Sequence, residues 1–389
     1  MVFKTDNFLK MSVLTACQVL VFVVDLSRKV KSYPRPFNEK RGKMLRNYKA
    51  EYMRLLTPGI AKRLSNIHEY KGAQDLFFLG RKNALRELID IATATSTRAT
   101  CSMMGLDEKL PTPGREDRLK QLTCYNSKPE SIYECEIAGY RTALIEIEQN
   151  YEFTPMNIST IEHIHNSIYW SVKEIDEKEE IPFWKVQSFD GESGIQDPQT
   201  SLVRLCEDFN NVSNDPEVDS LLLIPMFILD FIGYKSAIEG AERLSWLLLQ
   251  MLLLRAGYLV GKYVSIEKLI SESRPDYEAA LSINENCLRY GSNNYEPFVS
   301  FILDTIEKAY QPFFDWVKQI IAKRHSALSR VRSVLMNTEG KIEKSRICEL
   351  CQTLSPKSVE RSLKTLMENS EVTKIGGGRY TFYIWNKEQ

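Results

Sequence analysis

The sequence lacks the pattern of a metal site and of a disulfide framework. It holds only four histidines and eight scattered cysteines. The pair Cys348-x-x-Cys351 has neither a second pair nor two histidines at the spacing that zinc sites use. We therefore interpret these two residues as ordinary buried helix residues. Because the cysteines are unevenly spaced and no secretory context is evident, we expect a reducing, cytoplasmic location.

Net charge and long apolar runs are also missing. The 51 basic and 51 acidic residues cancel, which excludes a whole-chain field that would draw the protein onto nucleic acid or an anionic membrane. The apolar stretch of residues 12–24 is shorter than the roughly 20 residues that cross a bilayer. It also has no convincing small-residue cleavage site before Arg28. We expect a buried or amphipathic helix there, no membrane span, and only local contacts with any nucleic acid.

What the chain does contain is enough apolar residues for sizeable cores, placed mostly at helical spacing. Of 389 residues, 43% are hydrophobic, which predicts two or three domains. Few stretches alternate with the period of two that strands show. The predicted fold class is therefore mainly α, with helices expected in the middle of the chain at 157–173, 199–210, 216–233, 241–257, 275–288 and 294–325.

Breaks in this pattern divide the chain into four predicted segments. Residues 1–45 are an extension that contains a helix and a basic, proline-containing connector, and residues 46–130 hold the first helices of the core. Within the latter, polar residues and prolines predict a surface loop over 107–130. Residues 131–325 form the main helical part, and residues 326–389 form a separate domain.

The last domain combines helical and β patterns. Helical spacing over 341–353 and 355–369 is followed by two β-rich runs, Val372–Ile375 and Tyr380–Trp385, around the turn Gly376-Gly377-Gly378-Arg379. Two helices followed by a hairpin resemble a winged helix-turn-helix, a fold that binds DNA or docks other proteins.

Basic side chains on the second of these helices are the candidate DNA contacts. That helix is expected to present Lys357, Arg361 and Lys364, and Arg379 stands at the tip of the hairpin. Arg332 adds to this charge from the preceding helix. Acidic neighbours dilute the charge, so a module that docks a protein partner or a second copy stays open as the alternative.

Several ordered segments of the rest of the chain resemble the Fic (Fido) family. The helix with Phe227-Ile228-Leu229-Asp230-Phe231 leads into a loop, and a second helix ends in Leu252-Leu253-Leu254-Arg255-Ala256-Gly257-Tyr258. Upstream, Glu136-Ile137-Ala138-Gly139-Tyr140-Arg141 is similar to another recurrent Fic segment. The resemblance covers about residues 48–320 and implies a helical core with a β-hairpin flap. It also implies transfer of AMP from ATP to a protein hydroxyl.

The loop between the two helices departs from the family pattern His-Pro-Phe-x-Asp/Glu-Gly-Asn-Gly-Arg-x-x-Arg. With Glu239, Gly240 and Arg243 in register, Lys235 stands where the family has its histidine. In the family this histidine is the general base, and a base works best with a pKa near the working pH. A lysine, with an ordinary pKa of about 10.4, is suited to this role only if burial lowers that pKa by several units.

Two further departures alter the phosphate-binding part of the loop. Ala241 replaces the family asparagine, and Glu242 replaces the second glycine. A carboxylate at ~4 Å from a phosphate charge repels it by about 4 kcal/mol at an effective dielectric near 20, provided that it faces the ligand. By resemblance, Glu239 matches the acidic residue that helps to hold magnesium, and Arg243 matches the first arginine near the phosphates.

The second arginine of the family pattern is Trp246 here, and its usual partner has changed as well. Many Fic proteins carry an inhibitory Ser/Thr-x-x-x-Glu-Gly/Asn helix whose glutamate pairs with that arginine. This chain has Thr100-Cys101-Ser102-Met103-Met104-Gly105, with Met104 at the glutamate position. Because both halves of one ion pair have become apolar, we predict that Met104 packs on Trp246 with sulfur at ~5 Å from the ring.

These departures favour a Fic-fold protein that has lost AMP transfer and acts by binding or regulating a protein partner, without a required cofactor. The flap expected between residues 180 and 200 is short, which weakens the positioning of a target. The alternative is a residual adenylyltransferase that still uses ATP and Mg²⁺ through Glu239 and Arg243. Assembly into a homo-oligomer is left open by the sequence.

Overall fold

The structure is a computed structural model of the chain. It describes residues 48–78, 85–125, 127–175, 180–185, 198–283, 293–324, 327–338, 340–351 and 354–386. The predicted extension of residues 1–45 and most of the predicted flap therefore lie outside the described residues.

The chain divides into two compact units, Met1–Phe313 and Phe314–Gln389. The boundary falls inside helix α14 (Glu296–Arg324), one residue after Pro312. The sequence placed the start of the last domain at residue 326 instead, where the helical pattern weakens, because a boundary within one continuous helix leaves no break in that pattern.

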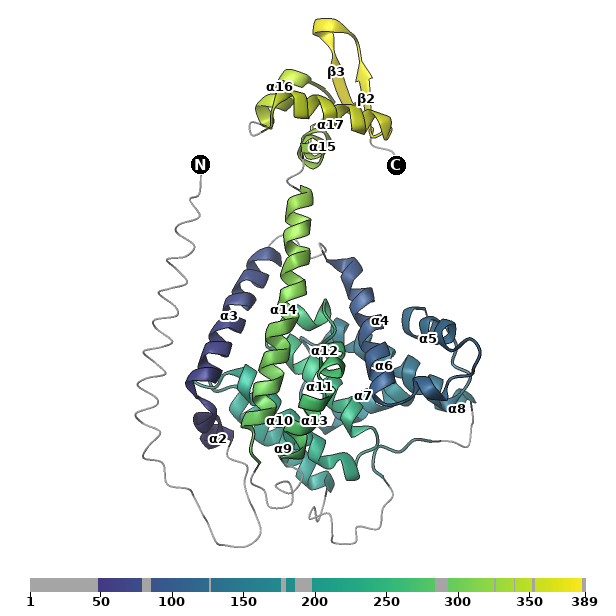
Figure 1. The fold of residues 1–389 in the computed structure, drawn as a ribbon, viewed down its shortest axis with the longest axis vertical. Helices are drawn as coiled ribbons and strands as arrows, with labels where there is room; N and C mark the ends of the chain where they lie inside the picture. The colour runs from purple at the N-terminus through teal and green to yellow at the C-terminus, as the bar shows by residue number, and fades with distance from the viewer. Residues whose placement is uncertain are drawn as a thin grey trace. The chain divides into compact units, whose positions relative to one another are not determined.

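The first unit is helical, as predicted (Figure 1). Its described helices are α2 (Tyr48–Leu55), α3 (Pro58–Phe78), α4 (Arg86–Met103), α5 (Arg115–Cys124), α6 (Ile132–Asn150), α7 (Ile158–Tyr169), α8 (Val172–Ile175), α9 (Pro198–Ser213), α10 (Ser220–Ile232), α11 (Ala241–Arg255), α12 (Ile266–Glu272), α13 (Arg274–Ser282) and the first part of α14. Short 3₁₀ turns are η1 (Asp107–Lys109), η3 (Gly233–Ser236) and η4 (Leu259–Lys262).

Helices α10 and α11 form the centre of this unit and pack against each other. Almost every side chain of both helices is buried. Helix α10 is apolar nearly all round, whereas α11 also buries the polar side chains of Arg243, Ser245 and Gln250. Helix α9 lies against α10, and α6 and α7 lie against α11 (Figure 1). The loop that carries the candidate site residues joins these two central helices and is therefore anchored at both ends.

A glycine allows α6 and α7 to approach closely. A Cβ at Gly139 would lie 1.7 Å from the carbonyl oxygen of Ile168. The Ala138-Gly139-Tyr140 step of the resemblance thus has a structural reason, since any larger residue would collide with backbone.

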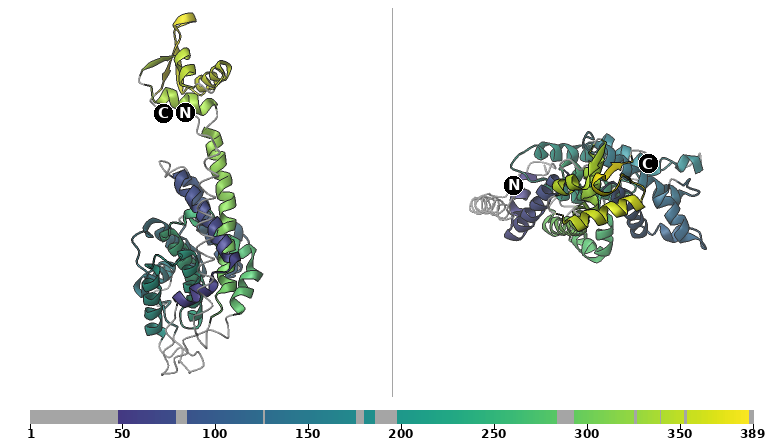
Figure 2. Two further views of the ribbon diagram at one scale, coloured as in Figure 1. Left: turned by 90° about the vertical axis from the view of Figure 1, so that its left-hand side faces the viewer. Right: turned by 90° about the horizontal axis from the view of Figure 1, so that it is seen from above.

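Buried hydrogen bonds fix the outer helices to the centre. The Asp230 carboxylate at the end of α10 accepts hydrogen bonds from Tyr48 on α2, at 2.7 Å, and from Tyr295 and Asn293 just before α14. The buried Gln74 amide of α3 bonds the backbone of Gly257 and Leu259 and the hydroxyl of Tyr310 on α14. Helix α3 accordingly lies along α14 in the side view of Figure 2.

The prediction of a surface loop over residues 107–130 was wrong in part. Residues Arg115–Cys124 form helix α5, and its Leu119 and Leu122 pack with Cys101 of α4 and Ile137 of α6. Two apolar positions three residues apart in a polar, proline-rich stretch gave too weak a periodic signal to predict this helix.

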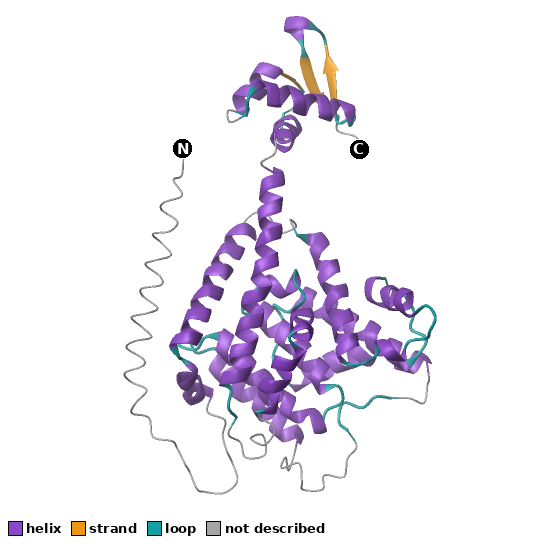
Figure 3. Cartoon of the chain, in the orientation of Figure 1, coloured by secondary structure: helices purple, strands orange, loops and turns teal. Residues whose placement is uncertain are grey.

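The second unit contains the sheet (Figure 3). Its elements are α15 (Ala327–Met336), β1 (Lys341–Glu343), α16 (Lys344–Leu350), α17 (Pro356–Glu368), β2 (Val372–Ile375), the 3₁₀ turn η5 (Gly378–Tyr380) and β3 (Phe382–Trp385). The antiparallel sheet has the order β1-β3-β2, with Ile342 opposite Tyr383 and Thr373 opposite Ile384.

The predicted hairpin is confirmed, whereas the start of the predicted helix 341–353 is wrong because residues 341–343 form strand β1. This strand has one buried residue, Ile342, and three residues are too few for an alternating pattern. At the hairpin turn Gly376 has φ +81, and a Cβ there would lie 2.1 Å from the Tyr380 carbonyl oxygen, so the turn requires glycine.

Within the described ranges, no helix is both long and apolar enough to cross a bilayer.

Candidate functional site

Lys235 lies on the outside of the loop. The 3₁₀ turn η3 places Tyr234, Ala237 and Ile238 in the core, and the amides of Ala237 and Ile238 donate to the Tyr234 carbonyl at 2.8 and 2.9 Å. The intervening Lys235 and Ser236 are exposed. A lysine acts as a base near neutral pH only when a dry pocket lowers its pKa, and the surface position of Lys235 does not provide such a pocket.

The outer edge of the loop is paired with residues 183–185. The Lys185 amide donates to the Ala237 carbonyl at 2.8 Å, and the Glu239 amide donates to the Phe183 carbonyl at 3.0 Å. The Lys185 ammonium adds a hydrogen bond to the Lys235 carbonyl at 3.0 Å and lies 3.7 Å from the Glu239 carboxylate. This short pairing lies within the predicted flap region and covers the loop that the flap was expected to adjoin.

Gly240 ends the loop in a left-handed conformation, with φ +64, just before α11. A Cβ at this position would lie 2.9 Å from the Tyr169 hydroxyl and 3.4 Å from the Arg243 guanidinium. The space behind the glycine is therefore already filled by these two side chains.

Arg243 is buried and points into the protein interior. Its guanidinium pairs with the Glu136 carboxylate of α6, donates to the Tyr169 hydroxyl at 2.7 Å and lies 5.6 Å from the centre of the Tyr169 ring. Only 7% of the residue is exposed. Burial raises the pKa of the Tyr169 phenol, so this hydroxyl stays neutral. The arginine that was predicted to meet phosphates thus already has an anionic partner.

Glu242 is directed toward α13 and has a cationic partner. Its carboxylate lies 3.1 Å from the Arg274 guanidinium. Arg274 also pairs with Glu278 at 2.7 Å and lies 5.5 Å from the centre of the Tyr277 ring. The repulsion calculated for an unpaired carboxylate facing a phosphate is therefore an overestimate here, because the charge of Arg274 offsets that of Glu242.

Met104 and Trp246 each have identified neighbours. Trp246 is buried, and its indole nitrogen donates to the Tyr277 hydroxyl at 3.3 Å. Met104 follows α4 and packs against the cluster that α5 forms with Cys101 and Ile137. Thr100 is buried on α4, and Gly105 has φ +64 after it. The direct contact between Met104 and Trp246 stays a prediction.

The loop carboxylate has no surrounding set of metal ligands. Glu239 accepts a hydrogen bond from the Gly240 amide at 3.2 Å through one oxygen, and Lys185 lies near the other. Among the residues that the structure describes, no group of three or more His, Cys, Asp and Glu could hold a metal ion. Arg243, the arginine predicted to meet phosphates, is paired with Glu136, so in this arrangement its guanidinium is not offered to a nucleotide.

Three residues around the loop were not assigned roles from the sequence. Glu136 was quoted only as part of a similar segment, and Tyr169 and His165 were not considered for the loop. His165 follows Ile161 by four residues, a spacing that places both on one face of a helix, so its burial could have been predicted from the sequence. In the structure both side chains are fully buried. No sequence signal linked Glu136 to Arg243 across 107 positions.

The predicted basic face of α17 is present in the second unit. Lys357, Arg361 and Lys364 are exposed, although Lys364 lies 3.8 Å from Glu368. Arg332 is less suited to a phosphate contact, because it forms two hydrogen bonds of 2.7 Å with Glu371. The side chain of Arg379 is outside the described set.

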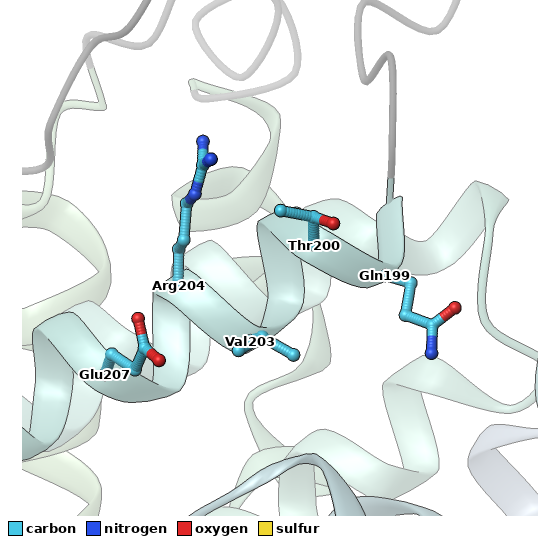
Figure 4. A pocket seen from close by; sticks show the side chains of 5 residues that line it. All are labelled: Gln199, Thr200, Val203, Arg204 and Glu207. Carbon is cyan, nitrogen blue, oxygen red and sulfur yellow. The ribbon is translucent and has the colours of Figure 1, made fainter.

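A separate hollow lies along α9. Its lining side chains lie along this one helix (Figure 4) and include none of the predicted site residues: Gln199, Thr200, Val203, Arg204 and Glu207.

Comparison with solved structures identifies Fic proteins at low similarity. A Fic family protein from Desulfovibrio desulfuricans G20 is 14% identical, with a TM-score of 0.49 over 86% of this chain and 97% of that one. A Fic domain containing signaling protein from Bacteroides thetaiotaomicron VPI-5482 is 14% identical, with a TM-score of 0.47 over 63% and 95%. Fic-1 (residues 134–508) from C. elegans is 18% identical, with a TM-score of 0.47 over 70% and 78%.

Each of these TM-scores is below 0.5, so the similarities do not by themselves establish a family or an activity. No family model matches the sequence, and no curated protein matches it.

Proposed function

We propose that the chain is a Fic-type protein that has lost AMP transfer and acts by binding or regulating a protein partner. The observation that carries the proposal is the burial of Arg243 against Glu136 and Tyr169. An arginine that binds phosphates must offer its guanidinium to the ligand, and releasing this one would leave the Glu136 carboxylate without its cation.

The exposed position of Lys235 supports the same proposal. The alternative, a residual adenylyltransferase, requires a base for the target hydroxyl. Lys235 lacks the dry pocket that this role needs. This alternative predicts that the protein attaches AMP to itself or to a target in the presence of Mg²⁺ and ATP, which intact-mass spectrometry detects.

Calorimetry with Mg²⁺ and ATP tests the proposal. We expect no binding to the wild type. We expect binding to a variant with Lys235→His, Ala241→Asn, Glu242→Gly and Trp246→Arg, because it restores the family loop and adds a second guanidinium for the phosphates while Arg243 stays paired with Glu136. A matched control carries Trp246→Leu in place of Trp246→Arg and should not bind, because it lacks the second arginine.

Thermal denaturation must accompany the calorimetry, since Ala241 and Trp246 are 3% and 2% exposed and polar groups there disturb the core. Micromolar binding by the wild type would overturn the proposal. A folded four-substitution variant that stays silent would show that these positions are not the cause of the loss.

A second candidate function belongs to the C-terminal unit, which we propose is a winged helix-turn-helix that contacts DNA phosphates through α17. The charge distribution favours this function. Residues 327–389 hold eleven Lys and Arg against seven Asp and Glu, whereas residues 48–326 hold 30 against 41. Residues 1–47 are also basic, with ten Lys and Arg against three Asp and Glu. Of the two segments compared, positive charge is concentrated in residues 327–389, which include the exposed face of α17.

Fluorescence anisotropy with duplex DNA at several salt concentrations tests this second function. We expect Lys357→Ala with Arg361→Ala to reduce the salt slope by about 2, since each lost phosphate contact removes about one. The control is Arg346→Ala, an exposed arginine of α16 that pairs with Glu349 at 2.7 Å. Absent or salt-independent DNA binding would favour a module that docks a protein or a second copy, and light scattering distinguishes the two.

A further inference from the structure

A fully buried histidine lies beside the loop. His165 on α7 has an exposed fraction of 0%. Neither of its ring nitrogens makes a hydrogen bond of good geometry in the described part of the chain, although the adjacent Asn166 side chain is near enough to raise the pKa of the ring in part. A buried polar group without a well-formed hydrogen bond is destabilising relative to a satisfied one, so packing alone does not account for a histidine here.

Residues 183–185 cover this histidine. The Phe183 ring meets the imidazole edge-on, with ring centres 5.4 Å apart, and the centre of the Tyr169 ring lies 4.7 Å from that of the imidazole. The covering residues are held to the loop by the two backbone hydrogen bonds to Ala237 and Glu239 and by the Lys185 side chain. Breaking these few bonds would free the Phe183 ring to leave the imidazole.

Burial disfavours a positive charge on His165 in the closed arrangement, and the charged groups around the ring act in opposite directions. Arg243 faces it from α11 and Glu239 from the loop. Glu136 of α6 is already paired with Arg243, and Glu239 already has the Gly240 amide and Lys185 as partners. Tyr169 on the same helix stays neutral. Both of these carboxylates therefore already have another partner, and burial outweighs the attraction of Glu239 for a protonated His165.

We propose that His165 is a proton sensor for residues 183–185, and that protonation of its imidazole releases them from the loop at residues 237–239. Release removes the two backbone hydrogen bonds and exposes the loop edge and the Phe183 ring. The proposal does not require the loop to bind a nucleotide, so it is independent of the function proposed above.

The pH dependence of the release of residues 183–185 follows from the burial of His165. Burial lowers the pKa of His165 from 6.5 to about 4. The closed arrangement is therefore fully stable above about pH 6.5 and loses stability as the pH falls toward 4. If an opened His165 has its ordinary pKa, the ratio of open to closed molecules should rise roughly thirtyfold between about pH 7.5 and about pH 5.

Hydrogen–deuterium exchange of the full chain tests the proposal. The amides of Glu239 and Lys185 take part in the two bonds that break, and their exchange is compared after correction for the pH dependence of intrinsic exchange. We expect their protection in the wild type to fall roughly thirtyfold over this range, and to stay constant in His165→Gln. The control is His163→Gln, two residues away on α7 with a side chain 72% exposed, which should behave as the wild type.

The same pH dependence in His165→Gln, or constant protection in the wild type, would overturn the proposal. If His165→Gln does not fold, an NMR titration of the imidazole in the wild type tests the proposal instead. We expect its protonation to coincide with loss of protection at Glu239 and Lys185, and a titration that leaves both amides protected would contradict the mechanism.

Discussion

Removal of the Glu136 carboxylate should destabilise the protein far more than removal of a surface charge. Glu136→Ala leaves the Arg243 guanidinium buried, since the side chains of the pair are only 8% and 15% exposed. Among the described residues, the neutral Tyr169 hydroxyl then remains as its hydrogen-bond partner. Breaking a buried pair from one side costs roughly 3–5 kcal/mol. We therefore expect the free energy of unfolding of the first unit to fall by about 3 kcal/mol or more.

A double-mutant cycle separates the pair from its surroundings. Arg243→Met removes the charge that Glu136→Ala strands, so the double variant should be more stable than the sum of the two single losses by about 1–3 kcal/mol. Urea denaturation of all four proteins, followed by circular dichroism, measures these differences. The surface control is Lys268→Ala, which removes a pair with both side chains more than half exposed and should cost less than about 1 kcal/mol.

If the losses of unfolding free energy in the two single variants add up to the loss in the double variant within about 0.5 kcal/mol, this reasoning is refuted. Such additivity would show that Arg243 and Glu136 do not interact across the interface between α11 and α6. A small loss in Glu136→Ala would have the same meaning, since water or another group would then satisfy the guanidinium.

Two further predictions concern packing and pH. Gly139→Ala should lower the thermal midpoint strongly, because its Cβ would lie 1.7 Å from the Ile168 carbonyl oxygen. The control Gly72→Ala, on an open face of α3, should have no effect or stabilise by about 0.5–1 kcal/mol. Equal midpoints for the two variants would contradict the close approach of α6 and α7. Burial raises the pKa of Glu148 from 4.5 to about 8, so its contribution to stability is complete below pH 4.5 and is lost as the pH rises to 8. Urea denaturation near pH 4.5 and near pH 8 should show that Glu148→Gln removes this decline in the free energy of unfolding. An unchanged decline would show that a group other than Glu148 causes it.

The central helices and the C-terminal hairpin could be predicted from the sequence because their apolar patterns are long or sharply bounded. Helix α11 begins at Ala241, as predicted, and β2 has the predicted bounds. Strand β1 and helix α5 could not be predicted, because each is held by contacts with residues distant in the sequence, Tyr383 for β1 and Cys101 for α5.

For the candidate site, the sequence predicted which residues belong to the motif but not the direction or the partners of their side chains. The sequence placed Lys235, Glu239, Gly240 and Arg243 in one motif, whereas in the structure Lys235 is exposed on the loop and Arg243 lies in the first turn of α11. It could not show that Arg243 turns inward to Glu136, or that Glu242 meets Arg274. Side-chain direction in the first turn of a helix depends on which neighbours occupy the adjoining helices, and a single sequence does not contain that information.

The hydrogen bonds of Asp230 define where a recombinant fragment of this protein can begin. A fragment that starts after α2 would lose the Tyr48 hydroxyl from a carboxylate that is 1% exposed, and loss of one partner of a buried group costs roughly 1–3 kcal/mol. The same applies to a fragment that stops before Tyr295. Expression trials of the first unit should therefore keep both residues, even though 247 positions separate them in the chain and neither lies in the loop.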